Sequence, residues 1–247
     1  MTGLKPGQYQ IAVFLNRSQL HVKKMNYQKV DLKAEVESVI ISAGLGLKRQ
    51  LSLWVQVPIY RTALWVIGDM GIGLKWNLPI RTKSTKVQFF LNEGVVLPTA
   101  DESVQSSRNL GYPIQGRLLN RSVGEIWLNW KNERTLGVQG LLDIEIGNEK
   151  HEGVSNNRVV QLTTYTIDHR FSRKKITPYL ALVYRRETQN PSDATGGWFI
   201  QLLGSIGMQL SDRYGVTISL GGPVVVGMKG ADLGQTNLGF ALQWTSK

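Results

Sequence analysis

Cysteine is absent from this 247-residue chain, and histidine is scarce. Without cysteine there is no disulfide framework, no thiolate nucleophile and no Cys-ligated zinc site. The three histidines are His21, His151 and His169, and none of them belongs to a motif with metal-ligand spacing. No glycine-rich phosphate-binding motif occurs either. We therefore expect no metal, no cofactor and no enzyme activity.

Long apolar runs are also missing, although 42% of the residues are hydrophobic. No run approaches the ~18 to 20 apolar residues of a membrane helix. This excludes helical spans only, because the signal of a transmembrane strand is weak in any one segment. The N-terminus, MTGLKPGQY, has no apolar signal-peptide core. If the protein is exported, we expect this chain to be its mature form with an initiating Met.

The chain does contain strict alternation of apolar and polar residues. In Met70–Leu78, every second residue is apolar and the residues between are glycine, lysine or asparagine. Residues two apart in a strand share a face, so one face is wholly apolar. A basic turn at Arg81–Lys86 leads into a second alternating segment that begins at Val87. This pattern predicts a β-hairpin with one apolar face.

The same alternation recurs in about twelve segments of roughly ten residues, the length that a tilted strand needs to cross a bilayer. The first is Gln8–Leu15, followed by a polar connection that we expect to reach about Lys33. The least clear is Arg158–Phe171, because its two faces are nearly equal in polarity. No segment has a long helical period. The pattern predicts an all-β protein.

The connections between these segments also alternate in length. Short turns are expected near Lys48, Thr82, Asn132, Arg173 and Asp212, and mostly longer polar loops near Lys24, Val104, Glu152, Ser192 and Ala231. Only the brief connection at Tyr60–Ala63 departs from this rule. Short turns on one rim, long loops on the other and an even strand number are typical of outer-membrane barrels. We predict a single domain, residues 1–247, forming one antiparallel, up-and-down transmembrane β-barrel of about 12 strands.

Two features favour lipid over a soluble core. The non-apolar faces carry small or uncharged residues such as Ser42 and Gly44, whereas strands facing water usually carry Lys and Glu. The last segment alternates Phe240, Leu242 and Trp244 close to the chain end, like the closing strand of outer-membrane barrels. Seven Trp and eight Tyr also suit a membrane–water interface. A soluble ligand-binding β-barrel is the alternative.

Much of the net charge of +11 comes from basic residues at the short turns. The basic residues in or beside the short turns are Lys48, Arg49, Arg81, Lys83, Lys86, Lys131, Arg134, Arg170, Arg173, Lys174, Lys175 and Arg213. They predict a solvated basic rim, or a rim that meets anionic headgroups or an acidic periplasmic partner. Nucleic acid is not expected, because no basic stripe with interleaved aromatic residues occurs.

Parity also predicts which side chains line the barrel interior. The predicted pore-lining residues are Trp54, Gln56, Asp69, Lys75, Asn92, Glu125, Trp127, Asn129, Asp143, Glu145, Tyr179, Arg185 and Gln201, with Tyr165 and Phe199 as further inward aromatic residues. Asp69 and Lys75 either form an internal salt bridge or line a passage. Glu93 shares the parity of the apolar residues around it. It therefore faces lipid near the rim, or a bulge shifts the register there, because an unpaired charge in mid-bilayer is costly.

Three stretches carry a family resemblance: LSLWVQVPIY (51–60), GDMGIGLKWNLPI (68–80) and FFLNEGVVLPTA (89–100). They resemble the outer-membrane barrels known as meta-pathway phenol-degradation transporters. The matching positions are Pro58, Gly68, Asp69, Leu97, Pro98 and Thr99, and the departure is Ala100, where Gly is usual. The resemblance implies a barrel in the outer membrane of a Gram-negative bacterium. It does not identify a cargo, and phenol transport is not implied.

The leading functional hypothesis is a porin-like channel for passive passage of small solutes, which the inward aromatic residues suggest are aromatic or amphipathic. A barrel of about twelve strands has a wider interior than an eight-stranded one. The second hypothesis is a structural barrel that sheathes or docks a partner protein at the outer membrane. A barrel phospholipase would need a Ser–His pair, for which His169 beside Asp168 is the one candidate. We interpret His169 as a rim residue.

Overall fold

The computed structural model describes residues 4–25, 28–61, 65–81, 85–99, 118–130, 134–145, 158–168, 175–188, 198–227 and 232–246. These residues form thirteen strands: β1 (Tyr9–Met25), β2 (Gln28–Lys48), β3 (Leu51–Arg61), β4 (Trp65–Ile67), β5 (Met70–Arg81), β6 (Thr85–Leu97), β7 (Leu119–Trp130), β8 (Arg134–Glu145), β9 (Arg158–Asp168), β10 (Ile176–Thr188), β11 (Trp198–Gln209), β12 (Tyr214–Gly227) and β13 (Asp232–Thr245). Among the described residues, no helix is long and apolar enough to cross a membrane.

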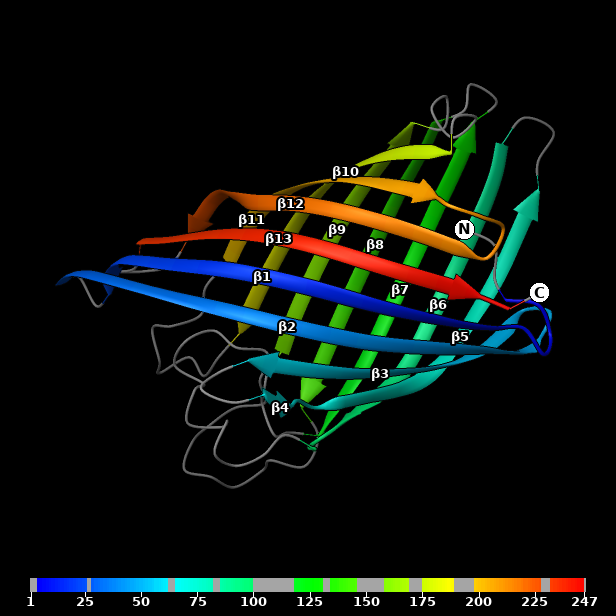
Figure 1. Ribbon diagram of the computed structural model, residues 1–247, viewed down its shortest axis with the longest axis horizontal. Helices are drawn as coiled ribbons and strands as arrows, with labels where there is room; N and C mark the ends of the chain where they lie inside the picture. The colour runs from blue at the N-terminus through cyan, green and yellow to red at the C-terminus, as the bar shows by residue number, and fades with distance from the viewer. Residues whose placement is uncertain are drawn as a thin grey trace.

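The strands close into one antiparallel barrel (Figure 1). Neighbours in sequence are neighbours in space, β1 also pairs with β13, and the β2–β3 pairing completes the ring. Both β4 and β5 pair with β3, so they are two parts of one barrel strand interrupted at Gly68–Asp69. The barrel therefore has 12 strands, and the predicted up-and-down, all-β architecture is confirmed.

The side chain of Thr99 bridges the interruption between β4 and β5. Its Oγ1 accepts a hydrogen bond from Met70 N at 2.9 Å and donates one to Gly68 O at 2.8 Å. Gly68 N donates to Pro58 O at 2.8 Å. A Cβ at Gly68 would lie 2.5 Å from the Tyr60 ring, so only glycine fits there. The positions that carry the family resemblance thus gather at one structural feature, the break in this strand.

The apolar residues of the strands face outward. Outward-facing Leu15, Ile206 and Leu220 are 45%, 52% and 66% exposed. Residues of the opposite parity are covered, since Ala12 and Trp127 are 6% and 3% exposed. A soluble barrel would have the reverse arrangement, with its apolar set inside. The outer wall is therefore built to contact lipid, which excludes the soluble-barrel alternative.

An aromatic row marks the turn-side edge of the apolar band. Tyr9 and Trp244 make an edge-to-face contact with ring centroids 5.1 Å apart, and Tyr214 pairs with Trp244 on the next strand. Tyr and Trp have an apolar body and a polar tip, so they favour the membrane–water interface. Both chain ends lie at this rim (Figure 1), where Ser246 N donates to Tyr9 O. The two chain ends therefore lie on the rim that carries the short turns.

A charged row marks the loop-side edge. Glu37 pairs in register with Arg17 of β1 and Arg61 of β3, and Arg61 pairs with Trp65 of β4. From Tyr9 to Arg17 the strand rises ~26 Å, which is ~20 Å along the axis at a tilt of about 40°. The apolar band between the aromatic and charged rows is therefore close in height to the ~25 Å apolar band of outer-membrane barrels.

Two of the predicted short turns fall within the described residues. Residues 49–50 connect β2 to β3, and residues 210–213 connect β11 to β12. In the second turn, Leu210 N donates to Tyr214 O at 2.9 Å. Both connections are as short as expected. The turns near Thr82, Asn132 and Arg173, and the loops near Val104, Glu152, Ser192 and Ala231, lie outside the described residues.

The prediction of a long polar connection up to about Lys33 is wrong. Instead, β1 continues to Met25, β2 begins at Gln28, and the two strands pair as far as Met25 and Gln28. Backbone pairing of the two strands, with one register shift between Val22 and Lys24, supports this extension. In Figure 1, β1 and β2 project well past the loop-side end of β3, accompanied by β13, whose Asp232 pairs with Lys24.

The ambiguous segment, Arg158–Phe171, is a strand only as far as Asp168 within the described residues. Inward-facing Thr163 and Ile167 are 2% and 5% exposed, while Thr164 and Thr166 alternate with them on the outer face. Threonine on both faces explains why the polarity of the sequence did not separate them. Phe171 and His169 lie outside the described residues.

Glu93 faces outward without a bulge. It pairs in register with Leu74 of β5 and Ser122 of β7, and neither ladder shifts at this point. Ser122 Oγ donates a hydrogen bond to Glu93 Oε2 at 2.7 Å. Of the two predicted arrangements, the bulge is therefore wrong and the outward orientation is confirmed.

Candidate channel lumen

The inward face of β5 to β9 carries a cluster centred on Glu125. Its carboxylate accepts hydrogen bonds from Lys75 Nζ at 3.1 Å, Trp127 Nε1 at 2.9 Å and Gln139 Nε2 at 3.3 Å. Tyr165 OH donates to Gln139 Oε1 at 2.9 Å, which holds the amide in place. We call Lys75, Phe90, Glu125, Trp127, Gln139 and Tyr165 the Glu125 cluster.

Strand register explains how these side chains meet. Glu125 lies directly opposite Phe90 on β6, and Phe90 in turn lies opposite Asn77 on β5. Lys75 is two residues from Asn77 and so has the same inward parity. To reach Glu125 it must cross β6, and its ammonium lies 4.6 Å from the centroid of the Phe90 ring. The cation is thereby held by a carboxylate and by an aromatic face.

Aromatic packing completes the cluster. The rings of Trp127 and Tyr165 stack with centroids 5.2 Å apart and an interplanar angle of 25°. Phe90, Trp127 and Ile167 are each almost fully buried, and Tyr179 packs against them. Side chains in a wide aqueous pore would remain exposed. This wall is therefore covered by a packed layer.

The Glu125 cluster is electrically balanced and firmly held. Glu125 is 7% exposed, and charge-assisted hydrogen bonds from three donors compensate for its removal from water. Removing one partner of such a pair leaves an uncompensated charge, at a cost of about 3 kcal/mol or more. One lysine and one glutamate give the cluster no net charge. It forms a fixed, neutral and partly aromatic surface inside the barrel.

Trp54 extends this layer onto β3. A Cβ added at Gly71, Gly73 or Gly94 would lie 2.9, 2.7 or 2.8 Å from the Trp54 indole, so the ring covers a floor of three glycines. Within the described residues, Trp54 Nε1, Asn92 Oδ1 and Asn77 Oδ1 make no hydrogen bond. The wall thus retains hydrogen-bonding groups that its protein neighbours do not use.

The opposite wall is nearly bare. In the ring of strands, β1 lies across from β8, and β13 lies across from β7. Inward positions of this wall carry small residues such as Ala12, Ser38 and Gly239. Two larger inward side chains, Phe14 and Gln243, are exposed, the first at 40%. Because these side chains point inward and are still accessible, the lumen is open beside this wall.

A tight turn folds the N-terminal residues onto the turn-side end of the bare wall. Gln8 N donates to Lys5 O at 2.9 Å, and Gly7 has a φ of 75°, which only glycine adopts readily. Leu4 Cδ1 would lie 3.1 Å from a Cβ on Gly44, and the Lys5 carbonyl lies directly against Gly46. These residues narrow the mouth of the lumen at the turn-side rim.

Several predicted lining residues lie away from the Glu125 cluster. Asn129 accepts a hydrogen bond from Thr135 Oγ1 at 2.6 Å near the turn-side rim. Gln201 is 9% exposed, and its amide packs over Gly221 on β12. Gln56 is half-buried on β3, beside Gly71.

The predicted salt bridge between Asp69 and Lys75 is wrong. Lys75 pairs with Glu125, whereas Asp69 is buried at the break between β4 and β5, with interactions of its own. Six residues separate Asp69 from Lys75, which is ~20 Å along an extended chain. Equal parity places two residues on one face but not within reach of each other.

The side chains of the other predicted residues lie outside what the structure describes, although their strands are placed. Asp143 pairs in register with Arg121, Glu145 with Leu119, and Arg185 with Phe199. Their lining role therefore stays a prediction. At the basic rim, the described side chains of Lys48, Arg49, Lys175 and Arg213 are exposed, as predicted for a solvated rim. Lys83, Lys131, Arg170, Arg173 and Lys174 lie outside the described residues.

Sequence reasoning missed two members of the cluster, Phe90 and Gln139. Phe90 follows lipid-facing Phe89, so its inward parity was available as a signal. Gln139 shares the parity of Asp143, which was predicted to face inward. Within the described ranges, no group of His, Asp and Glu side chains could hold a metal ion.

No protein-family model matches this sequence, and no curated protein matches it. Solved structures match its fold. An outer-membrane channel from Pseudomonas putida F1 is similar with a TM-score of 0.70 at 12% identity, over 98% of this chain and 97% of that chain. The NanC porin is similar with a TM-score of 0.54 at 9% identity, over 93% of this chain and 98% of that chain.

A further similar structure is the KdgM porin in complex with disordered oligogalacturonate, with a TM-score of 0.50 at 9% identity, over 94% of this chain and 98% of that chain. At such identities the comparisons establish the fold, which is that of outer-membrane barrels. The apolar outer band agrees, and the predicted location in an outer membrane is confirmed. The comparisons do not support the predicted periplasmic partner, and the narrower meta-pathway family stays a prediction.

Proposed function

We propose that this protein is a passive outer-membrane channel for small solutes. The observation that carries the proposal is the asymmetry of the lumen. The Glu125 cluster fills the wall formed by β5 to β9, while Phe14 and Gln243 point inward from the opposite wall and remain exposed. Solutes pass between the packed wall and the bare wall. We propose no enzymatic role.

The chemistry of the walls supports small neutral or zwitterionic solutes with an apolar part. The paired Lys75 and Glu125 give no net field for ions of one sign. Phe14 offers an accessible aromatic surface, and Gln243 offers an accessible amide. The solute that the KdgM structure contains belongs to that protein. A relation to the meta-pathway barrels is part of the proposal, supported by the structural role of Gly68 and Thr99 at the strand break.

Permeability measurements with paired variants test the proposal. Phe14→Trp places a larger ring in the open part of the lumen, whereas Val13→Trp places the same ring on the lipid face one residue away. Single-channel conductance in planar bilayers and swelling of liposomes in neutral solutes of increasing size would be recorded for both. We expect Phe14→Trp to lower conductance and the size limit, and Val13→Trp to leave them unchanged.

Two results would contradict a channel. One is a folded wild-type barrel in bilayers with neither conductance nor solute-dependent swelling, which would favour the structural barrel that docks a partner. The other is an equal effect of the two Trp variants, which would place the passage elsewhere. Folding of each variant is checked by β-sheet circular dichroism in detergent.

A further inference from the structure

One region of the outer wall interrupts the apolar band at its middle. Its outward residues, which we call the mid-band patch, are Glu93 on β6, Gly124 on β7, Gly140 on β8 and Thr164 on β9. Apolar side chains surround it, since Leu91, Ile126 and Leu162 are exposed on the same strands. Contact with lipid alone does not account for a carboxyl group and two bare glycines at this depth.

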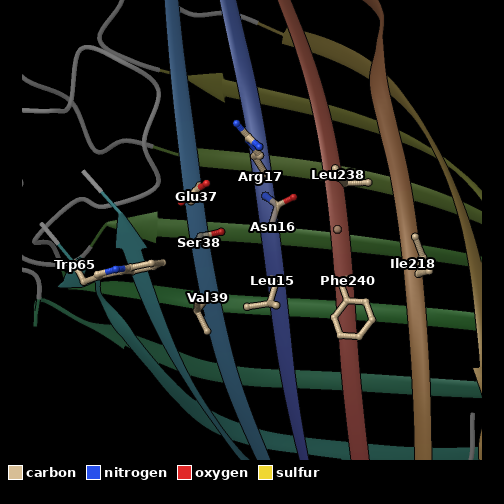
Figure 2. A pocket seen from close by; sticks show the side chains of 11 residues that line it. Leu15, Asn16, Arg17, Glu37, Ser38, Val39, Trp65, Ile218, Leu238 and Phe240 are labelled. Carbon is tan, nitrogen blue, oxygen red and sulfur yellow. The ribbon is translucent and has the colours of Figure 1, made fainter. Parts of the chain in front are cut away.

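The opposite side of the barrel shows the ordinary outer wall. A groove of about 410 Å³ lies there, over β12, β13, β1 and β2 (Figure 2). Apolar Leu15, Ile218 and Phe240 line its middle. Arg17 and Glu37 line only its loop-side end, at the charged row. The charged residues that line this groove are thus confined to the edge of the apolar band.

Glu93, in contrast, lies in the middle of the band rather than near the rim. Outward Leu91 precedes it on β6, and outward Leu97 follows it four residues later, ~13 Å along the strand. Its carboxylate accepts a hydrogen bond from Ser122 Oγ at 2.7 Å. Each carboxylate oxygen has two lone pairs, and acyl chains offer no donor for the others. An ionisable group at this depth therefore indicates a polar partner.

The residues of the mid-band patch lie at one level of the membrane. Gly124 and Gly140 are register partners, and the row through them continues to Leu91 on β6 and Leu162 on β9. Three strand spacings at a tilt of about 40° carry this row ~9 Å toward the loops from β6 to β9. Glu93 lies two residues from the row on the loop side, and Thr164 lies two residues from it on the turn side. This offset, ~10 Å along the axis, cancels the climb of the row.

The centre of the patch is open to a close neighbour. A Cβ added at Gly124 or Gly140 would have no other atom within 4 Å. Two barrels side by side touch along a line, and bare backbone on that line lets them approach most closely. At one side of the patch, Thr164 Oγ1 lies 3.5 Å from Leu182 O, at the limit of a hydrogen bond. A closer acceptor would therefore compete for the hydroxyl proton.

We propose that the mid-band patch is the contact between two copies of this chain in the same membrane. The two-fold axis runs along the membrane normal beside Gly124 and Gly140, so that β6 of one copy faces β9 of the other. Glu93 of each copy accepts a hydrogen bond from the partner's Thr164. The glycines of the two copies face each other between these two hydrogen bonds.

The patch is complementary to itself, which favours a second copy over other occupants. A two-fold axis along the membrane normal keeps every residue at its own level and exchanges the two sides of the patch. Glu93 and Thr164 lie on opposite sides at the same level, so each acceptor meets a donor. An acyl chain offers no donor, and lipid headgroups lie at the edges of the apolar band. A different protein would have to supply both groups, whereas this chain already carries them.

The contact is supported from inside the barrel. The Glu125 cluster packs against the inner face of the same strands, so this wall is filled on its lumen side. The bare wall with exposed Phe14 lies on the other side of the barrel. The dimer therefore leaves the lumen of each copy as it is in the single barrel.

Disulfide cross-linking in vesicles tests the contact, because the chain has no cysteine of its own. The full-length barrel with Gly124→Cys is reconstituted at low protein density, oxidised with copper phenanthroline and resolved by gel electrophoresis. Gly204→Cys is the control, since Gly204 is a lipid-facing glycine on β11, between outward Leu202 and Ile206. We expect a covalent dimer from Gly124→Cys and only monomer from Gly204→Cys.

Sedimentation equilibrium of the full-length barrel in detergent measures the strength of the contact. Glu93→Leu and Thr164→Val each remove both symmetric hydrogen bonds, so we expect either to raise the dissociation constant of the dimer by about tenfold or more. Thr166→Val, two residues away on the same outer face, should leave it unchanged. Gly124→Trp should abolish the dimer, whereas Gly204→Trp should not.

Three results would overturn the proposal. One is a wild-type barrel that stays monomeric in vesicles and at every concentration in detergent. Another is equal cross-linking of the Gly124→Cys and Gly204→Cys barrels, which would mean random collision. The third is a dimer that neither Glu93→Leu nor Thr164→Val weakens, which would place the contact on another face. If Glu93→Leu does not fold, as checked by β-sheet circular dichroism, Thr164→Val decides, because it removes the same two bonds.

Discussion

Lys75 and Glu125 form an ion pair, with Nζ and Oε1 3.1 Å apart, although a whole strand separates β5 from β7. The lysine crosses that strand over the Phe90 ring. This arrangement neutralises both charges and fixes them to one wall. It also leaves the opposite wall open, so the barrel is occluded on one side only.

Separating the two charges should change ion selectivity in opposite directions. Glu125→Gln leaves Lys75 uncompensated, and we expect the permeability ratio to shift toward anions by about twofold. Lys75→Met leaves the carboxylate, and we expect a similar shift toward cations. Reversal potentials across a salt gradient measure both. Glu93→Gln is the control, since this carboxylate faces lipid; shifts of the same sign in both cluster variants would contradict the arrangement.

Removing the lysine or the glutamate of this pair should lower the free energy of unfolding by unequal amounts. Glu125 is 7% exposed and the Lys75 side chain is 27% exposed, so a lone carboxylate would be harder to solvate than a lone ammonium. We expect Lys75→Met to lower the free energy of unfolding by about 3 kcal/mol, and Glu125→Gln by about half as much. Urea unfolding in lipid vesicles measures both. The reverse order would show that the lysine, not the carboxylate, is the more confined charge.

Alanine substitution should have opposite effects on stability at glycines of the inner face and at glycines of the outer face of the barrel. A Cβ at Gly73 or Gly94 would lie 2.3 or 2.4 Å from a backbone oxygen, and we expect a loss of about 2 kcal/mol or more. A Cβ at Gly124 or Gly140 would meet nothing within 4 Å. There we expect alanine to be neutral or to stabilise by about 0.5 kcal/mol. Similar unfolding free energies for all four variants would contradict the close backbone packing around Gly73 and Gly94 on the inner face.

Thr99→Val should weaken the joint between β4 and β5. The substitution keeps the shape of the side chain but removes both hydrogen bonds, to Met70 N and Gly68 O. We expect the free energy of unfolding to fall by about 1 to 2 kcal/mol. Thr166→Val is the control, because Thr166 is exposed on the lipid face. An equal effect at both positions would show that Thr99 has no special role.

Gly7→Ala should loosen the N-terminal turn. At a φ of 75° an added Cβ costs roughly 1 kcal/mol, and the turn holds Leu4 against Gly44 inside the turn-side mouth. We expect a matching loss of stability and a rise in single-channel conductance. Pro6→Ala is the control, since alanine adopts the conformation of proline at this position. Unchanged conductance in Gly7→Ala would mean that these residues do not narrow the mouth.

Much of the fold was predictable from periodicity. Lipid contacts one face of every strand, so alternation within the bilayer is enforced by the cost of exposing polar groups there. The length of β1 and β2 was not predictable in the same way. Residues 17–37 lie at or beyond the charged row, outside the part of the bilayer that enforces apolar residues on the outer face. On β9, Thr164 and Thr166 lie on the outer face, so polarity did not distinguish that face from the inner one.

The sequence predicted most of the residues that belong to the candidate site, but it did not predict which of them are in contact. Parity placed Lys75, Glu125 and Trp127 inside the barrel, and the structure brings them together. It also suggested Asp69 as the partner of Lys75, which the distance along the strand forbids. Phe90 was overlooked because its neighbour Phe89 fitted the lipid-facing row.

The sequence by itself determined that the chain is an all-β barrel, which face of most strands meets lipid, and where its basic rim lies. These properties follow from local alternation and from turn position, and both can be recognised in the sequence alone. Only the tertiary structure decided that Lys75 pairs with Glu125, that one wall is packed while the other is bare, and that a lipid-facing groove ends at Arg17 and Glu37. The cluster depends on the register between the paired strands β5, β6 and β7, and the groove depends on the pairing of β13 with β1 that closes the barrel.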